Sequence, residues 1–421
     1  MPHPSRRSLL GGAASLAFLG GLGGRSLAAT SNGRPPRNLV VFFAYGGWDP
    51  ALAFDPKPDV EAVITPPGEV QSHHGHDVFV LDEAPEVGTF FRNHGAEVCM
   101  LRGVDMVSIS HEICRRYALT GTAEARKPDL AAVVANTHGS DRPLPYLMVS
   151  SRAMPGPLAG VAGWLGRTNQ LGAMLNPDIG LAPLPELGLP PEEAVDPVAA
   201  WLAGRHERAA GRFTGSASGT AMWEDYAAGQ ERIAALETHR DGFRGLPGLE
   251  QIDNQVDIAL HTLANGLVRT VMLDSDANWD THYDNALQQR YYAKLFGALD
   301  RLMAGLQSTP GLEEDTLLEE TVVWVVSEMG RTPGLNDGAG KEHLPFTSTL
   351  MMGGGVKGGI TLGATTDGLV GQRVNLATGA LDDGGALVRP DNLVAGVLEG
   401  CGVSAEAWLP NVVPYMGPFV S

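Results

Sequence analysis

The stretch NLVVFFAYGGWDP, residues 38–50, predicts how the chain folds. It begins with a nearly continuous apolar run of strand length, and such runs are typical of parallel strands that are buried on both faces. Two glycines, Gly46 and Gly47, then allow a sharp turn, and Asp49 follows just beyond the strand. We therefore expect a buried parallel strand with an acidic side chain at its carboxyl end.

Similar apolar runs recur along the chain and alternate with helical patterns. The strand runs cover 97–104, 144–151, 269–276, 321–328 and 348–354, and the helical patterns cover 112–120, 128–138, 251–268 and 285–306. This alternation predicts an α/β fold, a three-layer sandwich whose mostly parallel central sheet has helices on both faces. Between about 152 and 248 the alternation stops, and Pro-rich turns there predict an insertion that forms a lid or cap.

Length and composition restrict the class of protein. A chain of 421 residues predicts a large core with an inserted or appended lobe rather than a small fold. The net charge of -18 argues against a nucleic-acid partner. The three cysteines, Cys99, Cys114 and Cys401, are irregularly spaced, so neither a disulfide framework nor a zinc knuckle is predicted.

The first 28 residues have the features of a twin-arginine export signal. Arg6 and Arg7 precede an apolar, Gly-rich run, and Ser26-Leu27-Ala28 supplies a cleavage site. The run is short for a spanning helix, and no other segment is apolar enough to cross a bilayer. We expect the twin-arginine translocase as a partner, a mature protein that does not span the membrane, and a periplasmic or secreted location. Such substrates are generally exported folded, often with a metal or cofactor in place.

Ionisable residues gather just after several strand runs, where ligands bind in sheets of this kind. Each residue alone could be ordinary loop polarity, but their recurrence at the same end of successive strands favours a binding site. They are Asp49, Asp274, Asp276, Asp280, His282, Glu328 and, in the next loop, His343.

Four short motifs resemble a known family. They are ANWDTH at 277–282, SEMGRTP at 327–333, KEHLPF at 341–346 and GGGVKGG at 353–359. With the export signal and the GGWD turn, the chain resembles a large bacterial family of exported proteins of unknown function, grouped with the sulfatases and alkaline phosphatases. The resemblance implies one alkaline-phosphatase-like domain over 38–408. It is weak across the expected insertion.

The stretch HEICRRYALTG, 111–121, resembles the segment that carries the sulfatase nucleophile, Cys-x-Pro-Ser-Arg-x-x-x-Leu-Thr-Gly. Arg115, Leu119, Thr120 and Gly121 coincide with that pattern, whereas His111 stands at the nucleophile position. Because the residue that would become formylglycine is missing, a formylglycine sulfatase is disfavoured.

His111 has three possible roles. It can ligate a metal through one ring nitrogen while a carboxylate holds the other, or it can attack phosphorus as a nucleophile. It can also cap a helix that begins at this point, although Ser110 is the more conventional N-cap. Arg115, one helical turn further on, would point the same way and suits an anionic group.

The alkaline phosphatases imply a ligand set for this chain. Asp49, Asp280, His282 and His343 match metal ligands of that family, and Glu328 stands where the Asp of an Asp-His pair belongs. Met329 replaces the His of that pair, so one metal is lost or the second site is rebuilt from His111 or Arg331. Mixed nitrogen and oxygen ligands fit zinc or manganese better than magnesium.

Two other motifs are interpreted as structural. SHHGHD, 72–77, has a metal-like cluster of histidines, but we interpret it as a solvated polar loop. GGGVKGG lacks the ending of a phosphate-binding loop and is expected to turn between strands.

Two functions are compatible with these residues. The first is a metal-dependent hydrolase of phosphate or sulfate esters, in which Arg115 and Arg331 would stabilise the transferring group. The second is a sulfatase-like pseudoenzyme that binds an anionic envelope polymer or a partner protein. Loss of the nucleophile favours the second, and retention of the ligand constellation favours the first.

Overall fold

The computed structural model describes residues 30–165 and 251–420, together with isolated positions between 197 and 239. The export signal expected at 1–28 lies outside the described residues. Most of the insertion expected at 152–248 lies outside them too.

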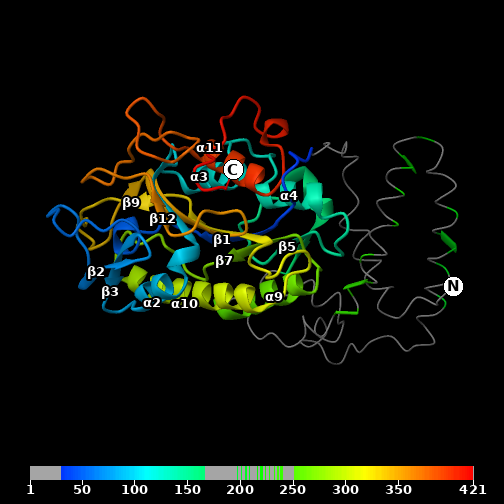
Figure 1. The fold of residues 1–421 in the computed structure, drawn as a ribbon, viewed down its shortest axis with the longest axis horizontal. Helices are drawn as coiled ribbons and strands as arrows, with labels where there is room; N and C mark the ends of the chain where they lie inside the picture. The colour runs from blue at the N-terminus through cyan, green and yellow to red at the C-terminus, as the bar shows by residue number, and fades with distance from the viewer. Residues whose placement is uncertain are drawn as a thin grey trace.

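An eight-stranded sheet forms the centre of the described part (Figure 1). All of its strands run in one direction except β11, which is antiparallel to both neighbours. The prediction of an α/β fold with a mostly parallel sheet is therefore confirmed. The strands, in spatial order, are β12 (Ile360–Leu362), β4 (Val98–Asp105), β11 (Phe346–Gly353), β8 (Thr321–Ser327), β1 (Asn38–Ala44), β7 (Thr270–Asp274), β5 (Tyr146–Met148) and β6 (Ala162–Trp164).

β1 lies near the middle of the sheet, between β7 and β8. Val41 is paired with Met272 on one side and with Trp324 on the other. Every residue of β1 is buried, because both faces of the sheet are covered. The opening apolar run is thus the central parallel strand that the sequence predicts.

Helices cover the two faces of this sheet, and the side chains of β1 alternate between them (Figure 1). Val40 and Phe42 belong to the core under one helix layer, and Leu39 and Val41 to the core under the other. The first layer consists of α2 (Glu86–His94), α9 (Ile252–Ala264) and α10 (Leu287–Ser308). The second consists of α3 (His111–Thr120), α4 (Leu130–His138) and α11 (Pro390–Gly400).

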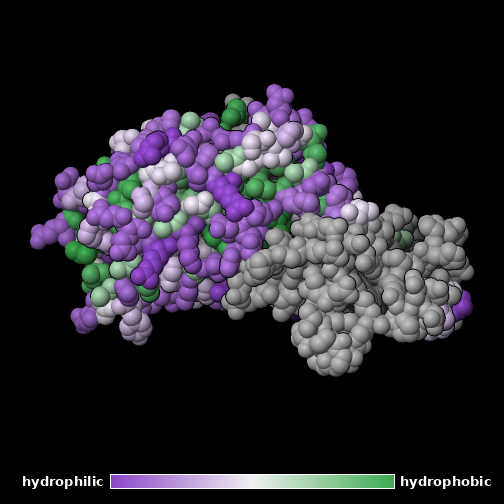
Figure 2. Space-filling model, turned by 90° about the horizontal axis from the view of Figure 1, so that it is seen from below, coloured by the Kyte–Doolittle hydropathy of each residue, from purple (hydrophilic) through white to green (hydrophobic). Residues whose placement is uncertain are grey.

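The described surface seen from below, on the side of α2 and α10, is mainly hydrophilic with scattered apolar residues (Figure 2). No helix among the described residues is both long and apolar enough to cross a membrane.

The short elements outside the main sheet include a ribbon of β9 (Gly330–Arg331) and β10 (His343–Leu344). They also include the 3-10 helices η1 (Pro50–Leu52), η2 (Gly95–Glu97), η3 (Gly156–Val161) and η6 (Ala405–Ala407).

The reversed direction of β11 has a simple cause. The chain between β8 and β11 forms only the β9–β10 ribbon. A parallel neighbour needs a crossover connection, usually a helix, whereas an antiparallel neighbour can be reached by a short return. The run at 348–354 is therefore a strand, as expected, and GGGVKGG links it to β12 as the expected turn.

The interpretation of SHHGHD as a solvated loop holds for Ser72, His74, Gly75 and Asp77, which are exposed, but not for His76. The motif spans the turn of a hairpin formed by β2 (Gly68–His73) and β3 (His76–Leu81). His76 is buried, and its ring nitrogens lie 2.8 Å from Thr361 Oγ1 and 3.1 Å from the carbonyl oxygen of Gly95. His76 is the first residue of β3 and faces the core, whereas His74 lies in the hairpin turn and is exposed.

Candidate metal centre

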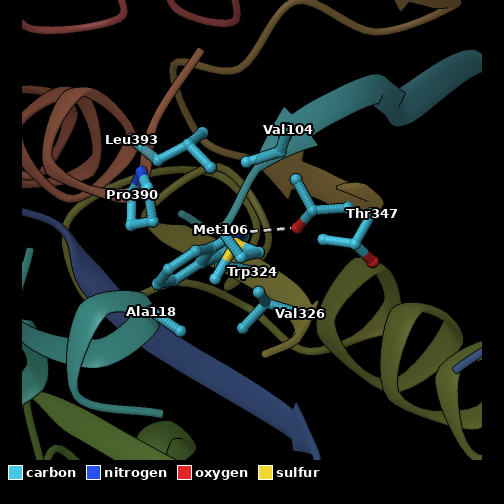
Figure 3. A pocket seen from close by; sticks show the side chains of 9 residues that line it. Val104, Met106, Ala118, Trp324, Val326, Thr347, Pro390 and Leu393 are labelled. Carbon is cyan, nitrogen blue, oxygen red and sulfur yellow. Dashed lines mark hydrogen bonds between the residues drawn. The ribbon is translucent and has the colours of Figure 1, made fainter. Parts of the chain in front are cut away.

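α3 places His111 at the carboxyl end of the sheet. Ser110 is the extended N-cap residue and His111 is the first helical residue, so the expected helix start is confirmed. The helix ends at Gly121, whose φ of 73° suits glycine. Beneath α3 lies an apolar hollow that leaves no room for water, lined by residues that include Ala118, Trp324 and Leu393 (Figure 3). Cys114, Ala118 and Leu119 on the buried face of α3 pack into the core and so anchor the helix that carries His111.

The turn after β1 brings the next part of the site close. Gly46 and Gly47 have φ values of 120° and 83°, which residues other than glycine rarely adopt. A Cβ on Gly46 would also lie 2.6 Å from the backbone nitrogen of Trp279. These glycines therefore let the β1 turn pack directly against the backbone that carries Asp280.

Three histidines converge on one carboxylate oxygen. The Nε2 atoms of His111, His282 and His343 lie 3.4, 3.1 and 3.3 Å from Asp280 Oδ1. The Nε2 atoms of His282 and His343 are only 2.9 Å apart. The structure thus brings together four of the side chains that the sequence singled out, from α3, the loop after β7 and β10.

The opposite nitrogen of each histidine contacts an oxygen. His111 Nδ1 lies 2.8 Å from Glu328 Oε1, and His343 Nδ1 lies 2.8 Å from the carbonyl oxygen of Ile109. His282 Nδ1 lies 3.1 Å from Glu342 Oε2. A carbonyl or an ionised carboxylate can only accept, so each Nδ1 carries the hydrogen. In the neutral rings, all three Nε2 lone pairs therefore face the same point.

The charges at this point perturb several pKa values. Burial raises the pKa of Asp280, but the hydrogen bond and charge of Arg331 and the contact with His343 outweigh it, and the pKa is about 2. Burial lowers the pKa of His111, yet the hydrogen bond and charge of Glu328 raise it above its usual value. Burial lowers the pKa of His343, and the charges of Arg331 and His111 add to the effect. The low pKa of Asp280 means that its carboxylate is ionised at neutral pH.

This donor set fits a divalent cation. One ligand atom from each of His111, Asp280 and His343 lies within 4.8 Å of the others, and His111 Nε2 is buried without a hydrogen-bond partner. Imidazole nitrogens that face each other repel unless a cation or a proton lies between them. Nitrogen ligands with one carboxylate suit zinc, and the oxygens that hold each Nδ1 are the usual outer partners of metal-bound histidines. The expectation of a metal site is supported to this extent; the identity of the metal stays a prediction.

Glu328 does not lie where a ligand was expected. Its Oε1 accepts from the backbone N–H of Gly46 at 2.8 Å and contacts His111 Nδ1, and Ser327 Oγ donates to Oε2 at 3.3 Å. The carboxylate is fully buried behind the histidine. In this structure Glu328 orients His111, and its expected contact with a metal stays a prediction.

Asp49 also departs from its expected role. Its Oδ2 forms a fully buried ion pair with Lys341 Nζ at 2.7 Å and accepts from Asn285 at 2.9 Å, while Oδ1 accepts from Ala51 N. With both oxygens engaged, Asp49 links the β1 turn to the segments just before α10 and β10. Its expected contact with a metal stays a prediction.

The two expected anion-binding arginines are occupied. Arg331 is fully buried, and it donates to Asp280 and to the backbone carbonyls of Gly46, Gly47, Trp279 and Lys341. It therefore positions Asp280 and cannot also reach a substrate. Arg115 donates to Glu112 on its own helix and to the carbonyl oxygen of Arg152.

Sequence reasoning missed several residues around the centre. Lys341 and Glu342 lie within the motif KEHLPF, but the motif alone indicates no role for either residue. Arg152 follows the strand run 144–151, and its guanidinium lies over the ring of Tyr45. The rule that selects ionisable residues just beyond a strand would have found Arg152. The partner of Lys341 depends on a contact between distant segments, so no local signal predicts it.

Comparison with solved structures finds distant likenesses. Ps i-CgsB, solved in complex with k-i-k-neocarrahexaose, has a TM-score of 0.40 and 10% identity, over 91% of this chain and 75% of that one. Phosphonate monoester hydrolase SpPMH from Silicibacter pomeroyi has a TM-score of 0.38 and 11% identity, over 90% and 77%. The corresponding hydrolase of Agrobacterium radiobacter has a TM-score of 0.33 and 11% identity, over 90% and 78%. These values carry no argument about activity.

Comparison with curated proteins finds no significant match. A family model described as "Protein of unknown function (DUF1501)" matches residues 36–408.

Proposed function

The chain belongs to this family of unknown function, DUF1501, and we propose from its site that it is a metal-dependent hydrolase of phosphate or sulfate esters. The observation that carries the proposal is the convergence of three Nε2 atoms on Asp280 Oδ1. His111, Asp280 and His343 would hold the cation, and His282 is close enough to be a fourth ligand. Zinc or manganese fits these ligands best.

The exposure of the ligands supports a catalytic rather than a structural site. The side chains of Asp280 and His282 are 32% and 28% exposed, so solvent and a small ester can reach the centre. Structural zinc sites are closed, whereas catalytic sites keep a position open. A bound cation would make water a stronger acid and would offset charge on the ester oxygens.

Two residues around the ligands, Glu328 and Arg331, position them. Glu328 holds the Nδ1 hydrogen of His111 and so keeps the Nε2 lone pair directed at the centre. Arg331 fixes Asp280 and holds it ionised. A ring whose Nε2 lone pair is occupied by a cation cannot also attack phosphorus, so the proposal has no covalent intermediate on His111.

We also propose that the protein reaches the periplasm or the exterior through the twin-arginine pathway. The paired Arg6 and Arg7 with the Gly-rich run behind them support this. Replacing both arginines by lysine should leave the precursor in the cytoplasm. Normal export of that variant would contradict the proposal.

The enzymatic proposal is tested with simple esters. Purified mature protein would be stripped by a chelator, reloaded with zinc or manganese, and assayed with nitrophenyl phosphate and nitrophenyl sulfate. We expect hydrolysis that is lost on chelation and restored by one of the two metals. Metal-loaded protein that hydrolyses neither ester would favour the pseudoenzyme instead.

A further inference from the structure

Three arginines lie on or next to α3, the helix that begins at His111, in a chain whose net charge is -18. Two of them, Arg115 and Arg116 on α3, share the carboxylate of Glu112, each at 2.9 Å. The third, Arg152, lies beyond the carboxyl end of β5 and has no carboxylate partner within the described ranges. Arg152 is therefore a positive charge without a carboxylate partner in this part of the chain, and it favours the approach of anions.

The guanidinium of Arg152 has a defined position. Its Cζ lies 3.6 Å from the centroid of the Tyr45 ring, and that ring lies 5.4 Å from the ring of His111, centroid to centroid. Stacking engages the flat face of a guanidinium and leaves its N–H groups free to donate in the plane. Within the described part of the chain, these N–H groups have no hydrogen-bond acceptor. Unpaired donors thus lie one aromatic ring away from a metal-ligating histidine.

The backbone of Arg152 is held on both sides. Its N–H donates to Ser150 Oγ at 3.0 Å, and its carbonyl accepts from Arg115 Nη1 at 3.1 Å. The hydroxyl of Ser150 in turn donates to Asp274 Oδ2 at 3.0 Å. These contacts fix the arginine before a ligand arrives, so little conformational freedom is lost on binding. They also give Arg115, expected to bind an anion itself, a role in supporting the arginine that does.

We propose that Arg152, stacked on Tyr45, binds a second anionic group of the substrate beside the ester held at the metal centre. The inference rests on the proposed hydrolase function and narrows its substrate class. The substrate would carry a further phosphate, sulfate or carboxylate group next to the ester that is cleaved. A planar fork of donors suits the oxygens of such a group.

The test compares two non-hydrolysable probes of similar shape. Phosphonopropionate has a phosphonate and a carboxylate, whereas propylphosphonate has a methyl group in place of the carboxylate. Binding to zinc-loaded protein would be measured by titration calorimetry. We expect the wild type to bind phosphonopropionate about 10-fold more tightly, as one charged hydrogen-bonded contact allows. Arg152→Met should abolish this preference and leave the affinity for propylphosphonate within about 2-fold.

Two further variants complete the test. Arg152→Lys keeps the charge but loses the fork, so it should retain only part of the preference. Arg301→Met is the matched control, because Arg301 is a half-exposed arginine on α10, on the opposite side of the sheet. It should behave as the wild type.

The outcomes separate this inference from the proposed function. Zinc-loaded wild type that binds both probes equally, or Arg152→Met that keeps the preference, would overturn the role of Arg152 alone. Protein that binds neither zinc nor manganese would contradict the hydrolase. In that case the same titrations on metal-free protein decide whether Arg152 still selects the carboxylate-bearing probe, and equal binding there would overturn the inference as well.

Discussion

Nδ1 of His111 lies 2.8 Å from Oε1 of the fully buried Glu328, at the end of the strand next to β1. This contact fixes which ring nitrogen carries the hydrogen and therefore which one can bind a metal. Glu328→Gln keeps the shape but loses the charge that favours this arrangement. We expect zinc affinity to fall about 10-fold to 100-fold, measured by competition with a chromogenic chelator.

Glu320 supplies the control for this variant. It is also buried, it lies at the opposite end of β8, and its carboxylate accepts from the backbone N–H groups of Leu312 and Glu313. Glu320→Gln should lower thermal stability without changing zinc affinity. Equal losses of affinity in the two variants would mean that Glu328 acts only through general stability.

His282 and His343 are predicted to bind the same cation, because their Nε2 atoms are 2.9 Å apart. Changing either residue to Ala should lower metal content and thermal stability together, since a bound metal stabilises the folded state by mass action. Metal would be counted by elemental analysis and unfolding followed by calorimetry. His94→Ala is the control, because His94 also contacts a carboxylate, Asp300 at 3.2 Å, but lies on α2. Full metal content in both site variants would refute the prediction.

The buried ion pair of Asp49 and Lys341 is predicted to stabilise the folded state around the site. Lys341→Met leaves the carboxylate of Asp49 buried without its countercharge, which typically costs about 3–5 kcal/mol of stability. Adding Asp49→Asn removes the unpaired charge, so the double variant should recover much of that loss. Urea unfolding of the wild type and the two variants measures both values. A double variant no more stable than Lys341→Met would contradict this account.

His76 is predicted to make stability depend on pH. Burial lowers the pKa of this ring below its usual 6.5, although its hydrogen bond to Gly95 opposes the shift. The unfolded chain therefore takes up the proton first, and the contribution of His76 is complete above pH 6.5 and is lost as pH falls toward the lower folded pKa. In urea unfolding, His76→Asn should lose less stability than wild type between about pH 7.5 and 5.5. An unchanged slope would show that other groups cause the acid sensitivity.

Much of the sheet could be predicted because its signals are local. The run 39–44 is apolar without interruption, and such a run is typical of a strand buried on both faces of a sheet. Local signals also place Asp280 and His282 beyond β7, at the edge where parallel strands end. The direction of β11 and the hairpin that buries His76 depend on how separate strands pair, which a pattern within one segment does not determine.

The roles of the site residues were harder to predict than their location. Asp49 and Glu328 lie at strand ends, as expected, but their partners are Lys341 and His111, which are far away in the sequence. A carboxylate paired with a lysine and one that orients a histidine look alike in a single sequence. Only the fold distinguishes them from a metal ligand.

The central claim is that His111, Asp280 and His343 bind a divalent cation. Without the side chain of His111, the protein should lose this cation. The most direct measurement is the metal content of purified wild type and His111→Ala after zinc loading and extensive dialysis. The account predicts stoichiometric zinc in the wild type and its loss, together with any ester hydrolysis, in the variant. Wild type without zinc would contradict it. A second result would also contradict it: His111→Ala keeps its zinc and loses only turnover, and acid-labile phosphate is trapped on His111 of the wild type. In that case His111 would be the nucleophile.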